Sequence, residues 1–186
     1  MSTSDRRVRR TRHAMHRALI ELMMERPYDR ITVSDVIARA DVGRSTFYAH
    51  YRDKDDLLVV SCGEHLREEI ARSPDRGRWA PVRVLIGLGA RYPDVYEPLI
   101  GPKGSATALR GYRSSVAAIL REHLDKQPGR PVDDLTVTML SWALVGLLTA
   151  VTDRANPVGP ESAWQQFAAL CGELLPAQHE RPPHHP

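Results

Sequence analysis

The sequence has few of the residues that build secreted or metal-stabilised domains. Its 186 residues contain only two cysteines, Cys62 and Cys171, which lie far apart and have no metal-ligand spacing around them. A small chain held together by disulfide bonds or by a zinc ion needs more cysteines than this, in short and regular spacings. The two cysteines are therefore interpreted as buried free thiols of a cytosolic protein.

Long hydrophobic runs are also absent. The longest apolar region, Met139–Val151, is interrupted by Ser141, Gly146 and Thr149. Because a membrane-spanning helix needs about 20 predominantly apolar residues, we predict no such helix. The N-terminal region has no apolar segment of the kind found in secretory signals. The protein is therefore expected in the cytoplasm, without a membrane partner.

A catalytic or metal-binding set is not recognisable. His13 and His16 are three residues apart but have no third ligand beside them, and His65 lies among glutamates that predict a solvated helix face. Ser114 and Ser115 have no neighbouring histidine to act as a base. We predict no enzyme activity, no cofactor and no metal.

The pattern of apolar residues predicts an all-α protein. Apolar positions recur at helical spacing through most of the chain, and no alternating strand pattern is present. Residues 177–186, which are rich in proline and histidine, are expected to be a disordered tail. The expected helices are Arg9–Glu25, two short helices within residues 32–51, Asp53–Arg72, Ala80–Arg91, a short piece between Pro93 and Pro98, Ser105–Lys126, Asp133–Asp153 and Glu161–Leu175.

Positive charge is concentrated at the N-terminal end. Residues 1–54 hold 12 of the 26 Lys and Arg but only 7 of the 23 Asp and Glu, whereas the rest of the chain has a small excess of acids. The segment Arg6–Arg12 is too basic to fold alone and is suited to follow a phosphate backbone or a minor groove. This distribution favours a nucleic-acid interface at one end of the molecule, although an excess of this size also occurs on solvated faces.

The stretch from Thr32 to Tyr51 has the pattern of two short helices joined by a tight turn. Thr32 and Ser34 are both placed to cap the start of the first helix with a hydroxyl. We expect Gly43 to adopt the positive φ angle of a sharp helix–helix turn, with Val42 as the apolar residue inside it. Phe47 is the inward residue of the second helix.

The outward residues of this second helix suit a DNA groove. Arg44 can pair with guanine, and Ser45 or Thr46 can bond base edges or phosphates. Tyr48 and Tyr51 offer hydroxyls to phosphates and rings to thymine methyl groups. A helix pair used only for packing is the alternative for a bare turn, but this register of small, polar and aromatic residues favours DNA binding.

The same region resembles the tetracycline-repressor (TetR) family of bacterial transcriptional regulators. The resemblance implies an N-terminal three-helix helix-turn-helix DNA-binding domain with a basic arm over residues 1–54. It also implies a C-terminal helical ligand-binding and dimerisation domain over residues 55–176. As a set the matching residues are specific, although each piece alone is weak. They cover about the first third of the chain and are Ala18, Leu22, Tyr28–Val33, Ile37–Gly43, Ser45–Tyr51 and Arg52–Leu58.

The DNA-contact candidates follow from that resemblance. Arg44 occupies a position that varies within the family, so it is expected to contribute sequence specificity. Lys54 begins the next helix, whose free backbone N–H groups also suit a phosphate. The expected partner is double-stranded DNA with a palindromic operator, in the bacterial cytoplasm and associated with the nucleoid. The candidates are Thr32, Arg44, Ser45, Thr46, Tyr48, His50, Tyr51 and Lys54.

The segment Asp133–Asp153 is apolar on nearly all sides, so it must be buried against more than one neighbour. The resemblance implies that the last two helices of two chains form a four-helix dimer interface; an ordinary monomeric core is the alternative. A homodimer also suits a helix-turn-helix, since two-fold symmetry reads palindromes. The candidate interface residues are Leu140, Leu144, Leu147, Leu148, Val151, Trp164, Phe167, Leu170 and Leu174.

A pocket for an unknown small-molecule effector is implied by the resemblance and not by the residues themselves. Apolar walls with a few polar groups would suit a mostly hydrophobic ligand, and each candidate can equally belong to an ordinary core. The candidates are Trp79, Leu85, Leu88, Tyr92, Tyr96, Leu109, Tyr112, Val116 and Trp142.

The sequence thus predicts a homodimeric, ligand-responsive repressor. The alternatives are a helical small-molecule carrier or enzyme whose N-terminal unit is structural, and a DNA-bound nucleoid organiser. The basic arm and the side chains of Arg44–Tyr48 argue against the carrier.

Overall fold

The computed structural model describes residues 3–102, 104–128 and 131–174. These residues form helices and no strand, which confirms the predicted all-α class. The predicted disordered tail, residues 177–186, lies outside the described residues. The helices are α1 (Thr3–Glu25), the 3-10 turn η1 (Tyr28–Arg30), α2 (Val33–Ala40), α3 (Arg44–His50), α4 (Lys54–Arg72), α5 (Ala80–Arg91), α6 (Pro93–Ile100), α7 (Ala106–Leu124), α8 (Asp134–Thr152) and α9 (Pro160–Leu174).

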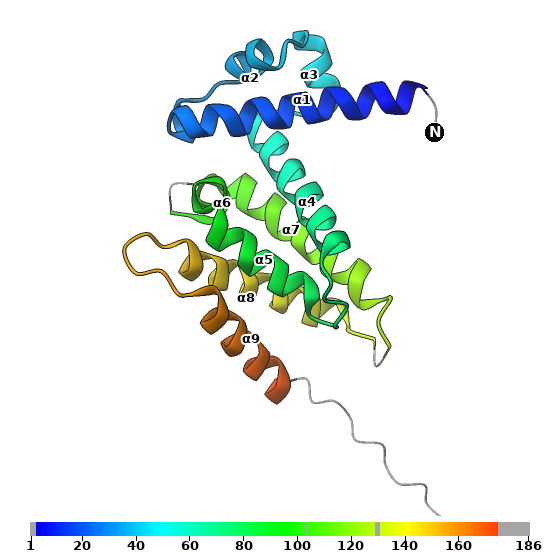
Figure 1. The fold of residues 1–186 in the computed structure, drawn as a ribbon, viewed down its shortest axis with the longest axis vertical. Coiled ribbons are helices and arrows are strands. Elements are labelled where there is room, and N and C mark those ends of the chain that lie inside the picture. Colours follow the sequence, from blue (N-terminus) through cyan, green and yellow to red (C-terminus); the bar gives the residue numbers. More distant parts are fainter. Residues whose placement is uncertain (1–2, 103, 129–130, 175–186) are drawn as a thin grey trace, which may run out of the picture.

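The helices are arranged as a small head, α1–α3, on a larger body, α5–α9 (Figure 1). Helix α4 joins the two, because it packs against α1 in the head and along α5 and α7 in the body. Buried apolar side chains form one cluster that continues from the head into the body. The position of the head therefore depends on the contacts of α4 at both of its ends.

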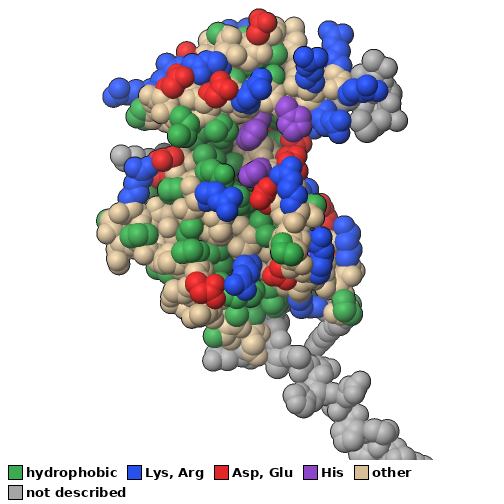
Figure 2. Space-filling model, in the orientation of Figure 1, with side chains coloured by type: hydrophobic (Ala, Val, Ile, Leu, Met, Phe, Trp, Pro, Cys, Tyr) green, Lys and Arg blue, Asp and Glu red, His purple; other side chains and the backbone are tan. Residues whose placement is uncertain are grey.

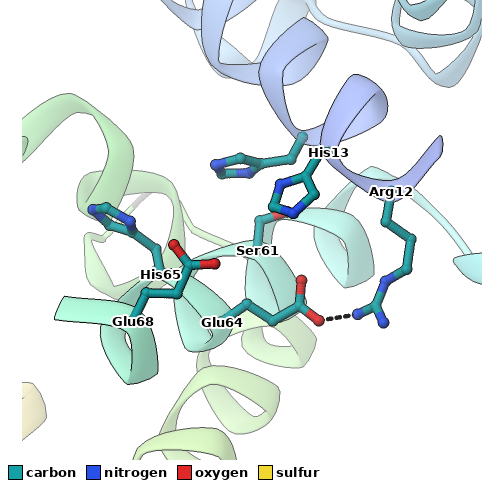
Figure 3. Close-up of a pocket in the computed structure, with 7 residues that line it drawn as sticks. Arg12, His13, Ser61, Glu64, His65 and Glu68 are labelled. Atoms are coloured by element: carbon teal, nitrogen blue, oxygen red, sulfur yellow. Dashed lines mark hydrogen bonds and ion pairs between the residues drawn. The ribbon is translucent and has the colours of Figure 1, made fainter. Parts of the chain in front are cut away.

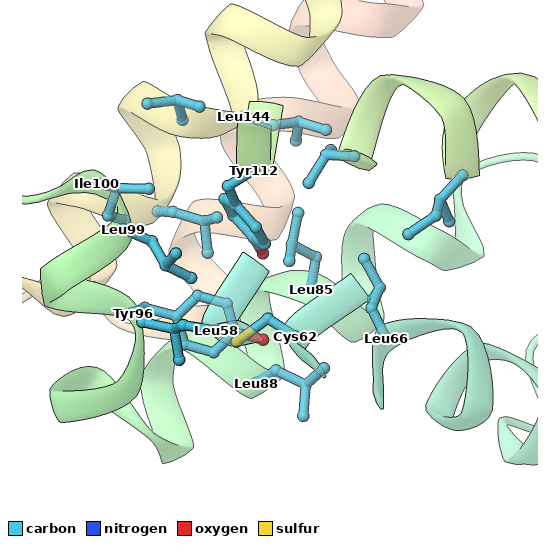
Figure 4. Packing of buried hydrophobic residues seen from close by; sticks show 14 of the residues in the cluster. Leu58, Cys62, Leu66, Leu85, Leu88, Tyr96, Leu99, Ile100, Tyr112 and Leu144 are labelled. Carbon is cyan, nitrogen blue, oxygen red and sulfur yellow. The ribbon is translucent and has the colours of Figure 1, made fainter. Parts of the chain in front are cut away.

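The body core lies between α4, α5, α6, α7 and α8 (Figure 4). Tyr96 and Tyr112 are buried within it, and their ring centroids lie 5.9 Å apart in an edge-to-face arrangement. Cys62 is buried in the same core. Helices α4 and α7 approach closely at Gly63, where a Cβ atom would lie 2.5 Å from the Ser115 hydroxyl. A larger residue at position 63 would require the Ser115 hydroxyl to rotate away.

The sequence predicts that the first helix begins at Arg9, whereas α1 begins at Thr3. The expected start of this helix is therefore wrong by six residues, and the basic segment Arg6–Arg12 is the first part of α1. The helix is anchored farther along by Met15 and Leu19, both fully buried. Extending an anchored helix through arginines costs little, since arginine is a good helix former.

Helix α8 is apolar over a longer stretch than the region Met139–Val151. Its 19 residues have a hydropathy of 1.8 and would suffice to cross a membrane by length and composition alone. The prediction that no segment reaches this length is wrong, since the apolar character extends from Leu135 and not only over Met139–Val151. The core helix of a folded domain passes the same test, and α8 packs against α5, α6, α7 and α9.

Candidate nucleic-acid interface

Helix α2 begins with a reciprocal cap. The Thr32 hydroxyl accepts a hydrogen bond from the Asp35 backbone N–H at 3.2 Å, and the Asp35 carboxylate accepts one from the Thr32 N–H at 2.8 Å. Hydrogen bonds from Thr32, together with the Arg26 guanidinium, lower the pKa of Asp35 to about 2. Thr32 caps α2 as predicted, and its hydroxyl also donates to the same carboxylate at 2.7 Å.

Arginines hold α2 against α1. The Arg39 guanidinium donates to both carboxylate oxygens of Glu25 at 2.8 Å, and Arg26 of the loop after α1 lies 3.0 Å from the Asp35 carboxylate. The helix is thus fixed by its apolar face and by charge pairs at its edges. The position of α2, and of the turn that joins it to α3, is therefore fixed relative to α1.

The turn between α2 and α3 differs in detail from the prediction. Its one positive φ belongs to Asp41, at 52°, and Gly43 has an ordinary φ of −71° as the residue before α3. The expectation that Gly43 supplies the left-handed residue is therefore wrong. Aspartate is one of the few other residues that tolerate this conformation. Val42 packs against the core, as predicted.

Helix α3 has one buried and one exposed side. Phe47 is fully buried, whereas Arg44, Ser45 and Tyr48 are exposed and Thr46 is half-buried. The Arg44 guanidinium lies 5.7 Å from the centre of the Tyr48 ring. The short helix therefore presents a cation, hydroxyls and an aromatic ring together, which are groups that bond base edges and phosphates.

Other predicted contact residues are engaged within the protein. Tyr51 is only 3% exposed, and its hydroxyl accepts a hydrogen bond from Arg12 at 3.4 Å. The Lys54 ammonium donates to the backbone carbonyl of Tyr28, and burial lowers its pKa. His50, at the end of α3, is half-buried and lies 6.2 Å from the Tyr51 ring. These residues support α3 rather than share its exposed surface.

Basic side chains extend this surface along the head. Figure 2 shows Lys and Arg side chains gathered over α1. Arg6, Arg7, Arg9 and Arg10 are all exposed on the helical N-terminal part of α1. Because they are now part of a helix, they form a rigid basic edge beside the helix-turn-helix.

Comparison with known proteins was made on sequence and on fold. Residues 17–60 match the family model described as bacterial regulatory proteins, tetR family. A segment of 79 residues is 42% identical to the HTH-type transcriptional regulator YxbF of Bacillus subtilis (strain 168), and it covers 38% of this chain but only 20% of that relative. The chain thus matches about a fifth of the relative's length.

Two solved structures share the fold over nearly their whole length. A TetR transcriptional regulator from Rhodococcus sp. RHA1 has a TM-score of 0.67 and 18% identity, and it is matched over 92% of this chain and 99% of its own. A TetR transcriptional regulator from Streptococcus agalactiae 2603V has a TM-score of 0.58 and 23% identity, over 90% and 96% respectively. At these identities the likeness concerns the fold.

The family model and the curated regulator thus match the helix-turn-helix region, and the two solved structures match the fold of the chain.

The predicted pocket residues lie in different environments. Most are buried in the body core or packed against it, whereas Tyr92 and Trp142 are 42% and 49% exposed. The cavities found between α1 and α4 and beside α2 are lined by other residues. The core members are Trp79, Leu85, Leu88, Tyr96, Leu109, Tyr112 and Val116.

The dimer candidates divide in the same way. Leu174 ends α9, and its side chain lies outside the described part of the chain. The exposed apolar side chains of α8 are Leu135, Met139 and Trp142, none of them in the predicted interface set, and Leu170 is exposed on α9. The residues that pack inside the single chain are Leu140, Leu144, Leu147, Leu148, Val151, Trp164 and Phe167.

Contacts between the head and α4 were missed by the sequence analysis. Arg12 of α1 forms an ion pair with Glu64 of α4, and it also donates to Tyr51. The partners are 52 residues apart in the chain, so no local spacing could have revealed them.

Proposed function

We propose that this protein is a TetR-family transcriptional regulator that binds a palindromic DNA operator as a homodimer and responds to a small molecule. It acts in the bacterial cytoplasm, at the nucleoid. Repression follows where the operator overlaps a promoter, since bound protein then excludes the polymerase.

The observation that carries the proposal is the two-sided character of α3. Phe47 anchors the helix in the head core, so the opposite side is held outward in one orientation. That side carries Arg44, Ser45 and Tyr48, with Thr46 at its edge. Arg44 is assigned to base reading and the exposed arginines of α1 to phosphates, because arginine pairs with guanine edges and with phosphate oxygens.

The homodimer is supported by the exposed apolar side chains of α8. Leu135 is 69% and Met139 63% exposed, although both belong to the most apolar helix of the chain. Exposed apolar side chains gathered on one helix are typical of an association surface. We call Leu135, Met139 and Trp142 the apolar stripe of α8. We assign the dimer contact to this stripe and to Leu170 of α9, beside the buried residues of the predicted interface. Two heads related by two-fold symmetry would read half-sites about 34–36 Å apart or a multiple of that.

The effector site is assigned to the body core around Tyr96 and Tyr112. Their hydroxyls are polar groups in an apolar surrounding, which suits a mostly hydrophobic ligand with a few hydrogen-bonding atoms. Helix α4 contributes Leu58, Cys62 and Leu66 to this core. A ligand that enlarges the core would displace α4 and with it the head, so it would favour one spacing of the two heads over another.

The proposal is tested by selecting bound duplexes from a random pool with the wild type and with Tyr48→Ala. We expect an enriched palindrome with the wild type and its loss with the variant. Tyr92→Ala is the matched control, since Tyr92 is exposed to a similar extent but lies on the body. It should enrich the same palindrome as the wild type.

Other outcomes favour other functions. Enrichment without any sequence preference would favour a nucleoid organiser, and no binding to duplex DNA would favour a small-molecule carrier with a structural head. A ligand that binds the body but leaves operator affinity unchanged at fixed salt would contradict the regulatory mechanism for that ligand.

A further inference from the structure

A polar cavity lies where the head meets the body, between α1 and α4 (Figure 3). Its volume is about 50 Å³, so it can hold only a few water molecules. Histidine side chains gather at the same level of the molecule in Figure 2. The cavity is lined by Arg12, His13, His16, Ser61, Glu64, His65 and Glu68.

Two polar atoms at this cavity are buried without a hydrogen-bond partner in the described structure. They are Nδ1 of His16 and the hydroxyl oxygen of Ser61, and Ser61 is only 3% exposed. Burying a polar group without a partner is unfavourable, and burying a charge is more so. The closed junction therefore favours a neutral His16 ring.

The electrostatic surroundings of His16 act in the same direction. Burial lowers its pKa, and the neighbouring His65 and His13 lower it further, while Glu68 opposes them. Arg12 adds positive charge on α1 but is paired with Glu64 of α4. The carboxylate of Glu68 is thus the one acidic neighbour that favours a charged His16.

The remaining elements at the junction contribute little charge to the cavity. On the body side, Tyr92 lies edge-on to His65 at 6.5 Å, and the Arg91 guanidinium is 5.9 Å from the Tyr92 ring. Helix α6 also packs against α1 and carries Asp94 and Glu97, neither of which lines the cavity; Asp94 is paired with Arg154.

The charged residues of α2 and of the far part of α1 are paired with each other and lie beside a different cavity. These residues are Glu21, Glu25, Arg26, Asp35 and Arg39.

A metal ion is not what this arrangement suits. Among the residues that the structure describes, no three His, Cys, Asp or Glu side chains are grouped closely enough to hold one. These imidazoles can instead gain a proton, because histidine titrates near neutral pH.

We propose that the α1–α4 junction is a pH-sensitive coupling, in which protonation of His16 on mild acidification releases the head from its fixed position on the body. A charged ring in this cavity lacks a partner at Nδ1 and faces His13 and His65. It becomes favourable when α1 moves away from α4 and the ring is fully hydrated. The proposal concerns the junction itself and does not depend on DNA binding.

The direction of the pH dependence follows from linkage. The pKa of His16 in the closed junction lies below its ordinary value of 6.5. The closed state therefore has its full stability above that value and loses it as the pH falls toward the lowered pKa. The opening equilibrium can change between the two pH values by at most the ratio of the two acid dissociation constants.

The test is amide hydrogen exchange of α1 and α4 at about pH 7.5 and about pH 5.5, corrected for the intrinsic pH dependence of exchange, in a range where histidine changes charge. We expect the protection of the facing parts of α1 and α4 to fall by about tenfold in the wild type. His16→Gln, which cannot be protonated, should show less than about a twofold change. His50→Gln, on α3 and away from the cavity, is the matched control and should behave as the wild type.

A second measurement does not need a variant. The NMR titration of the wild-type His16 ring should give a pKa below the ordinary value of 6.5. A His16 pKa at or above that value would overturn the proposal, as would an equal loss of protection in His16→Gln and the wild type. Because neither measurement uses DNA, failure here leaves the proposed regulatory function untouched.

Discussion

The Lys54 ammonium lies over the ring of Tyr28, 4.1 Å from its centroid, and donates a hydrogen bond of 2.7 Å to the Tyr28 carbonyl oxygen. The Tyr28 hydroxyl in turn donates to the Asp55 carboxylate at 2.6 Å. The loop between α1 and α2 is thus fastened to the first turn of α4. This fastening determines how the helix-turn-helix is held on the helix that leads into the body.

Replacing Lys54 by alanine should destabilise the protein. The variant loses a cation–π contact of about 0.5–1 kcal/mol and a hydrogen bond of about 0.5–1.5 kcal/mol. We expect a decrease of about 1–2 kcal/mol in the free energy of unfolding, measured by urea denaturation. Arg44→Ala is the control, because an exposed residue on the same head should change stability by less than about 0.5 kcal/mol.

The variants Lys54→Ala and Arg44→Ala also distinguish a residue that stabilises the head from one that contacts DNA bases. If Lys54 also contacts a phosphate, the Lys54→Ala variant should bind all duplexes more weakly. The slope of its log affinity against log salt concentration should be smaller by about one. Arg44→Ala should relax sequence preference instead. If both variants change preference alike, the assignment of Arg44 to base reading is wrong.

Asp35 should make the head sensitive to strong acid. Its pKa is lowered from 3.8 to about 2, so its contribution is complete above the ordinary value and is lost as the pH falls through that interval. Far-UV circular dichroism during acid titration should show this loss in the wild type and not in Asp35→Asn. Asp41→Asn is the control, since asparagine also tolerates the left-handed conformation, and it should titrate as the wild type does.

Met139→Glu should dissociate the proposed dimer. The variant places a charge in the apolar stripe of α8, and a buried unpaired charge is strongly unfavourable. We expect the dissociation constant to rise by more than about tenfold, which corresponds to ~1.4 kcal/mol, as measured by sedimentation at micromolar concentration. Met24→Glu makes the same change at an exposed methionine of the head; if it dissociates the protein equally, the stripe is not the interface.

Neither cysteine should react readily in the folded protein. Burial raises the pKa of the Cys62 thiol to about 12 and that of Cys171 to about 11. Since the thiolate is the reactive form, a thiol reagent at mildly alkaline pH should label both residues only after unfolding. Rapid labelling of Cys62 in the native protein would mean that α4 separates from α7 far more often than this packing suggests.

The helix-turn-helix was predictable because its signals are local. Thr32 and Asp35 are three residues apart and form the cap, and Phe47 is the apolar residue of a short polar helix. The positive φ was assigned to Gly43 instead of Asp41, because glycine is the commoner choice and the turn geometry depends on both flanking helices. The contact of Lys54, a DNA-contact candidate by the resemblance, with Tyr28 is not predictable from local spacing, since the two residues are 26 apart in the chain.

The body was less predictable because its helices are apolar on several sides. Composition shows that α8 is apolar, but only packing decides that Leu144 faces the core and Trp142 faces outward. The histidine cavity depends on tertiary contact as well. His13 and His16 are visible as a pair in the sequence, whereas His65 reaches them only because α4 crosses α1.

Helix α4 begins at the head and runs along α5 and α7 of the body (Figure 1). Its 19 residues correspond to a length of about 28 Å at 1.5 Å per residue. A tilt of about 10° about its body end would therefore displace the head by about 5 Å, a distance close to one helical turn. In a two-fold assembly both reading helices would move at once. In the proposed dimer, a small repacking beside Leu66 would therefore become a larger change in the spacing of the two heads.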